Sequence, residues 1–188
     1  MELYELTQKV KDLFEVDELD KLGPALQDCA LNNGADKMDR FVELVGGDLS
    51  VDWLQKIFQY NLADRSGKKQ DFTPKCLAEF LSVLVGDSDV VVDMCAGSGA
   101  LTIQRWTQNP DQKFELYEID RTVVPFLLFN LAVRNIDAEV FVGDVLSDDE
   151  AIEEQWLVVR DKEETEAETL LEGVRRKYGR VRRVESSL

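Results

Sequence analysis

The short segment from residue 93 to residue 99 has the residue types of a ligand-binding loop. It reads DMCAGSG, and its candidate ligand-contacting residues are Asp93, Cys95, Ala96, Gly97, Ser98 and Gly99. Small side chains let a ligand approach the backbone closely, and a helix that starts after them presents free N–H groups. An acid in front of them would repel a pyrophosphate but attracts an ammonium group. The loop therefore predicts a ligand with a cationic amino-acid moiety.

Two common phosphate-binding patterns do not fit this loop. The dinucleotide fingerprint G-x-G-x-x-G is incomplete, because Gly97 and Gly99 are followed by Thr102 rather than by glycine or alanine. A P-loop needs G-K followed by serine or threonine, and this is absent. Both differences favour the cationic ligand over a pyrophosphate.

Apolar periodicity predicts the elements that must hold the loop. Residues 89–94, 113–120 and 138–145 have the pattern of strands, and residues 100–108 and 121–135 have that of helices. Strand and helix in alternation form the half-unit of a doubly wound, Rossmann-like α/β fold with a parallel sheet. Because the first strand contains an uninterrupted valine run, we expect it at the centre of the sheet, covered on both faces.

A separate helix is predicted directly before the first strand. Thr73 is its expected N-cap and Pro74 its first residue, where the missing N–H costs nothing. Gly86 suits the C-terminal cap.

The flanking segments are predicted to be helical on the amino-terminal side and charged on the carboxyl-terminal side. Residues 1–62 have apolar residues at helical intervals, broken at LGPAL and GGD, and Ser50 and Asp36 are the expected N-caps of two helices. WLVV suits a short fourth strand, and acids followed by bases over residues 161–177 favour a helix. The expected regions are a helical amino-terminal region (1–64), a Rossmann-like core (65–160) and a charged helix and tail (161–188).

The composition excludes several classes of function. The 188 residues include 38 acids, 22 bases and no histidine, which gives a formal net charge of -16. Without histidine there can be no His-based triad, His–metal site or imidazole general base. The acidic balance opposes free-standing DNA binding, because that affinity comes from Lys and Arg that displace phosphate counterions. We expect DNA contact only weakly or through a partner, and an acidic surface that engages a basic protein.

The cysteines and the amino-terminal segment favour a cytoplasmic protein without a bound metal. Cys29, Cys76 and Cys95 are an odd, widely spaced set with no C-x-x-C pair, which favours reduced thiols. No apolar run reaches the roughly 18 residues that span a bilayer, and MELYELTQKVKD lacks the features of a signal peptide.

The loop and the segment before it resemble a known family. DMCAGSG resembles the first motif of class I S-adenosylmethionine-dependent methyltransferases. With QDFTP upstream, the sequence is similar to the adenine-specific (N6) DNA methyltransferases of restriction–modification systems. In that family an aromatic residue, threonine and proline precede a helix that leads to a D-P-A-C-G-S-G-like loop. Phe72, Thr73 and Pro74 match the first element, and the resemblance implies that Phe72 and Thr73 contact the cofactor. In the loop, Met94 replaces the proline and the Cys–Ala order is inverted.

The resemblance covers about residues 70–147 and implies contacts with S-adenosylmethionine. Glu118 matches the acid that binds both ribose hydroxyls, and Asn130 begins a matching N-L pair in the next helix. Asp144 matches the acid that accepts a hydrogen bond from the adenine amine of the cofactor. From the residues alone other roles stay open, because Phe72 could be a core residue and Asp144 could cap a loop.

The catalytic motif of the resembled family is absent. Family members carry an N-P-P-Y or D-P-P-F-type motif after the fourth strand, which binds the target amine and stacks on the flipped base. The four prolines, Pro24, Pro74, Pro110 and Pro125, all precede Asp144. EEQWLVVRDKEE stands at the expected place. Trp156 and Asp161 could replace the motif, but a fourth strand that ends in a charged turn is the stronger interpretation.

These observations predict a truncated, Rossmann-like protein that binds S-adenosylmethionine and is incomplete for catalysis on its own. The tail after residue 144 is too short for the remaining strands and a target-recognition domain. One alternative is a non-catalytic acidic interaction protein that keeps the fold, of the anti-restriction or methyltransferase-partner type and from a phage or mobile element. Another is a minimal methyltransferase with a divergent acceptor site. No catalytic residue is nominated.

Overall fold

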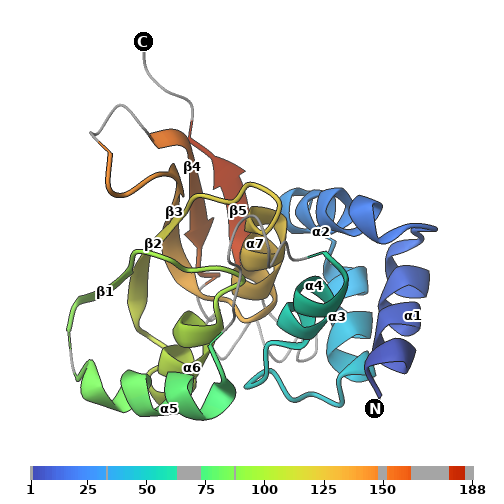
Figure 1. Cartoon of the computed structure of the whole chain (residues 1–188), viewed down its shortest axis with the longest axis horizontal. Coiled ribbons are helices and arrows are strands. Elements are labelled where there is room, and N and C mark those ends of the chain that lie inside the picture. The colour runs from blue at the N-terminus through green and yellow to red at the C-terminus, as the bar shows by residue number, and fades with distance from the viewer. Residues whose placement is uncertain are drawn as a thin grey trace, which may run out of the picture.

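A bundle of helices forms the amino-terminal part of the protein. The computed structural model describes residues 2–32, 34–62, 73–86, 88–147, 152–161 and 178–184. The first two of these ranges contain α1 (Leu3–Phe14), the 3-10 helix η1 (Leu19–Lys21), α2 (Leu22–Leu31), α3 (Ala35–Leu44) and α4 (Trp53–Asn61). Figure 1 shows these helices on one side of α7 (Val124–Val133) and the sheet on the other side. The helices predicted from apolar periodicity are confirmed, although LGPAL begins α2 instead of breaking a helix.

The helices begin at caps that differ from the predicted ones. Asp52, not Ser50, is the N-cap of α4, and its carboxylate accepts a hydrogen bond from the backbone N–H of Gln55 at 2.9 Å. The N-cap of α3 is Gly34, so Asp36 lies in the first turn, where the helix dipole favours a negative charge. Both predicted caps are therefore wrong. In each case two residues near the helix start have types that are common at N-caps: Ser50 and Asp52 before α4, and Gly34 and Asp36 around the start of α3. The sequence does not show which of the two is the cap.

The remaining described elements alternate between helices and strands. They are α5 (Lys75–Leu84), β1 (Val90–Asp93), α6 (Ala100–Gln108), β2 (Lys113–Glu118), α7, β3 (Asp137–Gly143), β4 (Ile152–Val159) and β5 (Arg180–Arg183). β1 pairs with β2, and β2 with β3, in parallel. Right-handed crossovers then place α6 and α7 on the same face of the sheet. The truncated Rossmann-like α/β fold is confirmed.

The helix before the sheet is confirmed with a small shift at its start. Pro74, rather than Thr73, is the N-cap residue of α5, and no side chain caps that end. Gly86 has a φ of +67° just after the helix, as expected for a glycine that ends it.

β1 lies at an edge of the sheet, which corrects the central position predicted for it. The five described strands follow the order β1-β2-β3-β4-β5, so β1 has a neighbour on one side only. Val90 and Val92 are 44% and 49% exposed. They lie in register with Lys113 and Glu115, on the more exposed face of the sheet. A valine run shows that a strand is apolar, but its neighbours depend on strand order, which the local pattern does not encode.

β4 and β5 extend the sheet in antiparallel orientation beyond β3. Trp156 is buried within β4, which confirms the fourth strand and places this ring in the core of the protein. The basic segment over residues 180–183, which belongs to the region predicted as a charged helix and tail (161–188), forms the strand β5. Most of the helix predicted for residues 161–177 lies outside the described residues.

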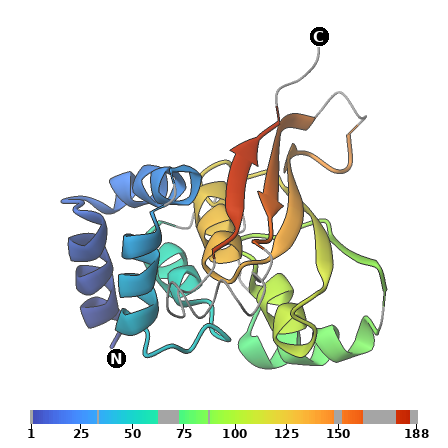
Figure 2. The ribbon, with the colours of Figure 1, turned by 180° about the vertical axis from the view of Figure 1, so that it is seen from behind.

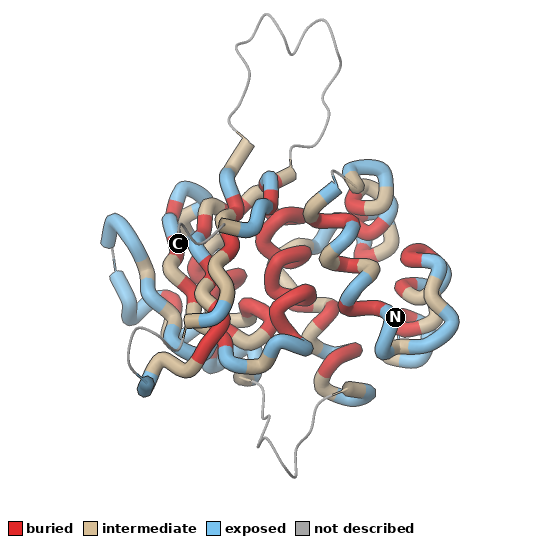
Figure 3. Tube along the Cα trace, turned by 90° about the horizontal axis from the view of Figure 1, so that it is seen from above, coloured by how far each residue is buried: buried red, intermediate tan, exposed pale blue. Residues whose placement is uncertain are grey.

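One hydrophobic core joins the helical region to the sheet. All ten residues of α7 are buried, and Figure 3 shows this helix buried along its length near the centre of the molecule. The ring of Phe129 makes edge-to-face contacts with Phe14 at 5.4 Å and Phe41 at 5.2 Å, and Phe126 does so with Phe58 at 5.1 Å. On its other side α7 packs against β3, β4 and β5. Figure 2 shows β5 next to α7 from behind.

The cysteines are free, as predicted. Cys29 is buried, and Cys76 and Cys95 are exposed. Burial raises the pKa of the Cys29 thiol to about 11. None of the helices in the described ranges is long and apolar enough to cross a membrane.

Candidate functional site

Three acids stand at the carboxyl ends of the three parallel strands. Asp93 ends β1, Glu118 ends β2, and Asp144 directly follows β3. Neighbouring parallel strands end at the same edge of a sheet, so the fold brings these three predicted residues to one side of the molecule. In open α/β sheets ligands bind at this carboxyl edge.

The loop between β1 and α6 turns at two glycines with left-handed backbone. Gly97 has a φ of +56° and Gly99 a φ of +97°, values that glycine adopts at little cost. Gly99 is the N-cap of α6, and a Cβ atom there would lie 3.0 Å from Cδ1 of Leu127 on α7. The backbone N–H of Ala96 donates to the carbonyl of Tyr117 at 2.9 Å, which attaches the loop to β2. The loop therefore has a defined shape that depends on its small residues.

Glu118 connects the end of β2 to the loop. Its Oε2 accepts a hydrogen bond from the N–H of Gly97, and its Oε1 accepts one from the N–H of Asp120, each at 2.7 Å. Burial raises the pKa of this carboxyl, and the two backbone donors partly oppose that shift. Each carboxylate oxygen has about two lone-pair sites. Glu118 can therefore accept one further hydrogen bond at each oxygen, as two neighbouring hydroxyl groups would require.

Asp93 has one carboxylate oxygen without a hydrogen-bond partner. Oδ1 accepts from the backbone N–H of Cys95 at 3.1 Å. Oδ2 is buried and accepts no hydrogen bond within the part of the chain that the structure describes. Burial also raises the pKa of this carboxyl. A buried acceptor without a donor costs free energy, so this oxygen suits the ammonium group that the loop sequence predicts.

Ser98 uses its side chain in a buried network with the helical region. Its hydroxyl donates to Oδ2 of Asp52 at 2.6 Å. The side-chain amide of Asn130 donates to Oδ1 of Asp52 at 3.0 Å and to the carbonyl of Ser98 at 2.9 Å. Ser98 and Asn130 are both 1% exposed. The hydroxyl and the carbonyl of Ser98 therefore hold the loop against the start of α4 and against α7.

Arg134 also belongs to this network and connects it to the segment before α4. Its guanidinium donates to the carbonyls of Leu49 at 2.8 Å and Val51 at 2.9 Å, and to Oδ1 of Asn130 at 2.8 Å. Burial lowers the pKa of Arg134 to about 10, against the effect of the nearby Asp52 carboxylate. Burial also raises the pKa of Asp52, and Arg134 opposes that change. The network therefore balances a buried acid with a buried base.

Sequence reasoning missed Asp52 and Arg134 as residues that hold the loop. Asp52 contacts Ser98 and Asn130 from 46 and 78 positions away in the chain, and no local pattern encodes such pairs. The available signals were an acid directly before a helical pattern and an arginine directly after α7, whose residues are all apolar except Asn130.

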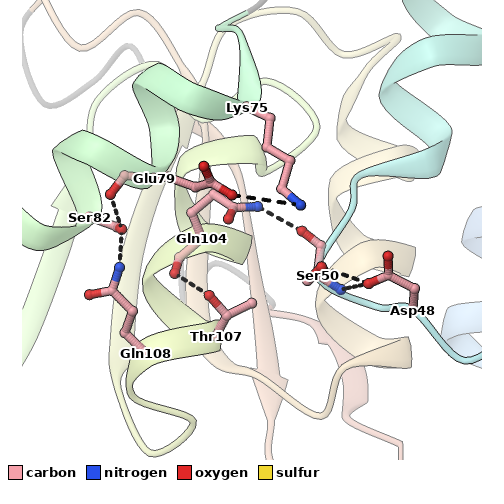
Figure 4. A network of polar contacts seen from close by, with 8 residues as sticks. All are labelled: Asp48, Ser50, Lys75, Glu79, Ser82, Gln104, Thr107 and Gln108. Carbon is pink, nitrogen blue, oxygen red and sulfur yellow. Dashed lines mark hydrogen bonds and ion pairs between the residues drawn. The ribbon is translucent and has the colours of Figure 1, made fainter.

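Polar contacts also attach α5 to α6, and α6 to the segment before α4. Figure 4 shows the side-chain amide of Gln108 donating to the hydroxyl of Ser82, and that of Gln104 donating to the carbonyl of Ser50, the latter at 2.7 Å. These contacts fix α6, and with it the end of the glycine loop, between α5 and the helical region.

A cavity of about 650 Å³ lies beside the start of α6, but the three acids do not line it. Its walls come from α1, α4, α5 and α6 and include Trp53, Thr73, Ala100 and Gln104. Thr73 therefore lines the same cavity as Ala100, the first residue of α6, a helix whose first backbone N–H groups lack helical partners. The predicted residues therefore lie in two places. Asp93, Glu118 and Asp144 are at the strand ends, whereas Thr73 lines this cavity.

The other predicted residues have varied positions. Cys95 is exposed in the loop. Asp144 caps the turn after β3, because its Oδ1 accepts from the N–H of Leu146 at 2.9 Å and its Oδ2 accepts from the hydroxyl of Ser147 at 3.2 Å. This is the loop-capping role that the sequence left open for Asp144. Phe72 lies outside the described residues.

Comparison with known proteins relates this site to one family. The family model for the methyltransferase small domain matches residues 65–160, which is more than half of the chain. The matched range includes β1, the glycine loop and the acids at the three strand ends. Searches of the curated proteins and of the solved structures found no match.

Proposed function

The chain belongs to the methyltransferase small domain family, and from this premise we propose that it binds S-adenosylmethionine and is related to N6-adenine DNA methyltransferases. We further propose that it is incomplete for catalysis on its own. When bound, S-adenosylmethionine supplies an electrophilic methyl group. The residues of this chain would bind and orient that molecule, while the groups that hold the methyl acceptor would come from elsewhere.

The buried Oδ2 of Asp93, which accepts no hydrogen bond from any residue that the structure describes, is the observation that carries this proposal. It stands at the start of the glycine loop, beside the strand whose end carries Glu118. An ammonium group would satisfy Oδ2, and a pair of ribose hydroxyls would use the remaining lone pairs of Glu118. One ligand with both features, such as S-adenosylmethionine, would therefore match both acids. Asp144 stands at the next strand end and has lone pairs for an amine donor, although it already caps a turn.

The absence of an acceptor-binding motif supports the view that catalysis is incomplete. No proline follows Asp144, so the sequence lacks the N-P-P-Y type of motif. Trp156, the aromatic residue near the expected place, is 5% exposed inside β4. A ring in that position cannot stack on a flipped base without unfolding the strand.

A second candidate function is a non-catalytic interaction protein that keeps the fold. One observation favours it: the loop satisfies many of its own polar groups. Both oxygens of Glu118 accept backbone hydrogen bonds, and the hydroxyl of Ser98 is bound to Asp52. A loop that these hydrogen bonds already hold in place can have a purely structural role and needs no ligand.

Calorimetric titration with S-adenosylmethionine separates these two functions. We expect wild-type protein to bind, Gly97→Arg to lose binding because the new side chain fills the loop, and Glu118→Ala to lose at least about tenfold in affinity. Glu115→Ala is the matched control, since it removes an acid from the opposite face of the same strand. Its affinity should equal that of wild type.

The outcomes of this titration are distinct. No heat and no thermal stabilisation at millimolar S-adenosylmethionine would contradict cofactor binding and favour the interaction protein. If the protein binds, incubation with labelled S-adenosylmethionine and adenine-containing DNA should transfer no methyl group. Transfer by the chain alone would contradict the proposal that it is catalytically incomplete.

A further inference from the structure

The two edges of the sheet differ in how they are protected against pairing with another chain. β5, at one edge, has three exposed arginines, Arg180, Arg182 and Arg183. Charged side chains on an edge strand discourage the addition of a further strand. β1, at the other edge, reads VVVD and contains no lysine, arginine or proline. No other strand in the described part of the chain pairs with its outer side. β1 therefore has the composition of an edge that accepts a strand.

α5 presents an uncovered apolar face next to α6. Ala78 and Ser82 are the residues of α5 that are buried, and α5 packs on α6. Leu77, Phe80 and Leu84 are exposed, and their spacing of three and four residues puts them on one stripe of the helix. Phe80 is 59% exposed and Leu84 is 63% exposed. A contiguous apolar stripe of this kind marks an interaction site more often than an ordinary surface.

The edge of β1 and the stripe of α5 belong to the same end of the molecule. Figures 1 and 2 show α5, α6 and β1 together at the end remote from α1 and α3. Val90 and Val92 of β1, and Met94 directly after it, are also exposed. We call the three exposed residues of the α5 stripe and these three residues, together with the free backbone edge of β1, the β1–α5 surface.

The charges around this surface favour a basic partner over a second copy of the chain. Asp89 is exposed directly before β1, and Asp93 ends it. On β2, Lys113 and Glu115 lie in register with Val90 and Val92 and offset one another. On α5, Lys75 and Glu79 lie 3.7 Å apart and offset one another. Two copies that meet along β1 would bring acidic strand ends together, and each whole chain has a net charge of -16. Lysines or arginines beside an apolar strand would instead be attracted.

We propose that the β1–α5 surface docks a basic protein partner, which adds a strand to β1 and covers the α5 stripe with apolar side chains. This role goes beyond cofactor binding and does not depend on it. A strand at this edge would also extend the parallel half-sheet on the side where doubly wound sheets continue.

The test uses a short labelled peptide of alternating valine and lysine as the probe. We expect the full chain to bind it and to protect the backbone amides of Val90–Asp93 from hydrogen exchange. Val92→Lys and Phe80→Lys should each weaken binding at least about tenfold. Leu146→Lys is the matched control, because Leu146 is 92% exposed, lies after β3 and receives the same charge change. It should bind as wild type does.

Several results would overturn this proposal. They are the absence of binding, equal binding of a peptide with glutamate in place of lysine, and equal loss of binding in Leu146→Lys. Self-association of the chain that Val92→Lys abolishes would show that a second copy occupies the surface. Glu118→Ala should bind the peptide normally, so failure of cofactor binding and failure of docking are distinguishable.

Discussion

The two ends of the molecule bury their apolar residues to very different degrees. At the helical end, α1, α3 and α4 direct phenylalanines into α7, where Phe41 and Phe129 are fully buried. At the other end, Phe80 of α5 and Val92 of β1 are more than 40% exposed. The helical end therefore accounts for much of the stability of the fold. The β1–α5 end contributes less to stability and leaves apolar side chains exposed.

The largest expected effect comes from removing one aromatic ring at the helical end. Phe129→Ala should lower the free energy of unfolding by about 3–5 kcal/mol, because the ring is fully buried between α1 and α3. Phe80→Ala makes the same change on α5 and should alter stability by no more than about 0.5 kcal/mol. Urea unfolding of both variants measures the difference. A similar loss in Phe80→Ala would show that the α5 stripe is packed in solution and would remove the contrast between the two ends.

A somewhat smaller effect is expected where the helical end meets the glycine loop. Asp52→Ala removes the acceptor for Ser98, Asn130 and the backbone of Gln55. It also removes the stronger of the two acids that offset the charge of the buried Arg134, the other being Asp48. We expect a loss of roughly 3 kcal/mol. Asp36→Ala is the control, because Asp36 is an exposed acid in the first turn of α3. If the two variants unfolded at the same urea concentration, Asp52 would not join the loop to the helical region.

The smallest expected effect is a pH dependence of stability from Glu118. Burial raises its pKa, so the folded protein holds a proton at pH values where the unfolded chain has released it. Between the ordinary and the raised pKa, this group makes the free energy of unfolding decrease as pH rises. The contribution is fully present below that window and lost above it. Urea unfolding across this range should show a decrease in the free energy of unfolding that is smaller in Glu118→Gln, while the buried Asp52 and Asp93 contribute decreases of the same sign in both proteins. Parallel profiles for the two proteins would contradict a raised pKa at this residue.

The elements near the loop could be predicted because their signals are local. Thr73 and Pro74 precede a helix, and the helix over residues 100–108 has the predicted bounds. Asp93 and Glu118 could be placed at the same edge because parallel strands end together. These inferences need only periodicity, turn residues and the half-unit of an α/β fold.

The edge position of β1 and the roles of Asp52 and Asn130 could not be predicted, because they depend on contacts between distant parts of the chain. The edge position of β1 follows from where β4 and β5 pair, and nothing within residues 89–94 reports that. The role of Asp52 needs Ser98 and Asn130 to meet it across three separate elements. The resemblance indicated Asn130 as a matching position, but the physical reason for an amide there emerges only from its contacts in the folded chain.

A titration of isotope-labelled protein with S-adenosylmethionine, followed by backbone amide NMR, tests whether the strand ends and the glycine loop hold the cofactor. We expect shifts at Gly97, Gly99 and Asp120, whose amides belong to the loop or follow β2, and little change in α1 and α3. Shifts around Trp53 and Gln104 instead would place the ligand in the cavity beside α6. That result, or the absence of shifts at millimolar ligand, would contradict a cofactor site built on Asp93 and Glu118.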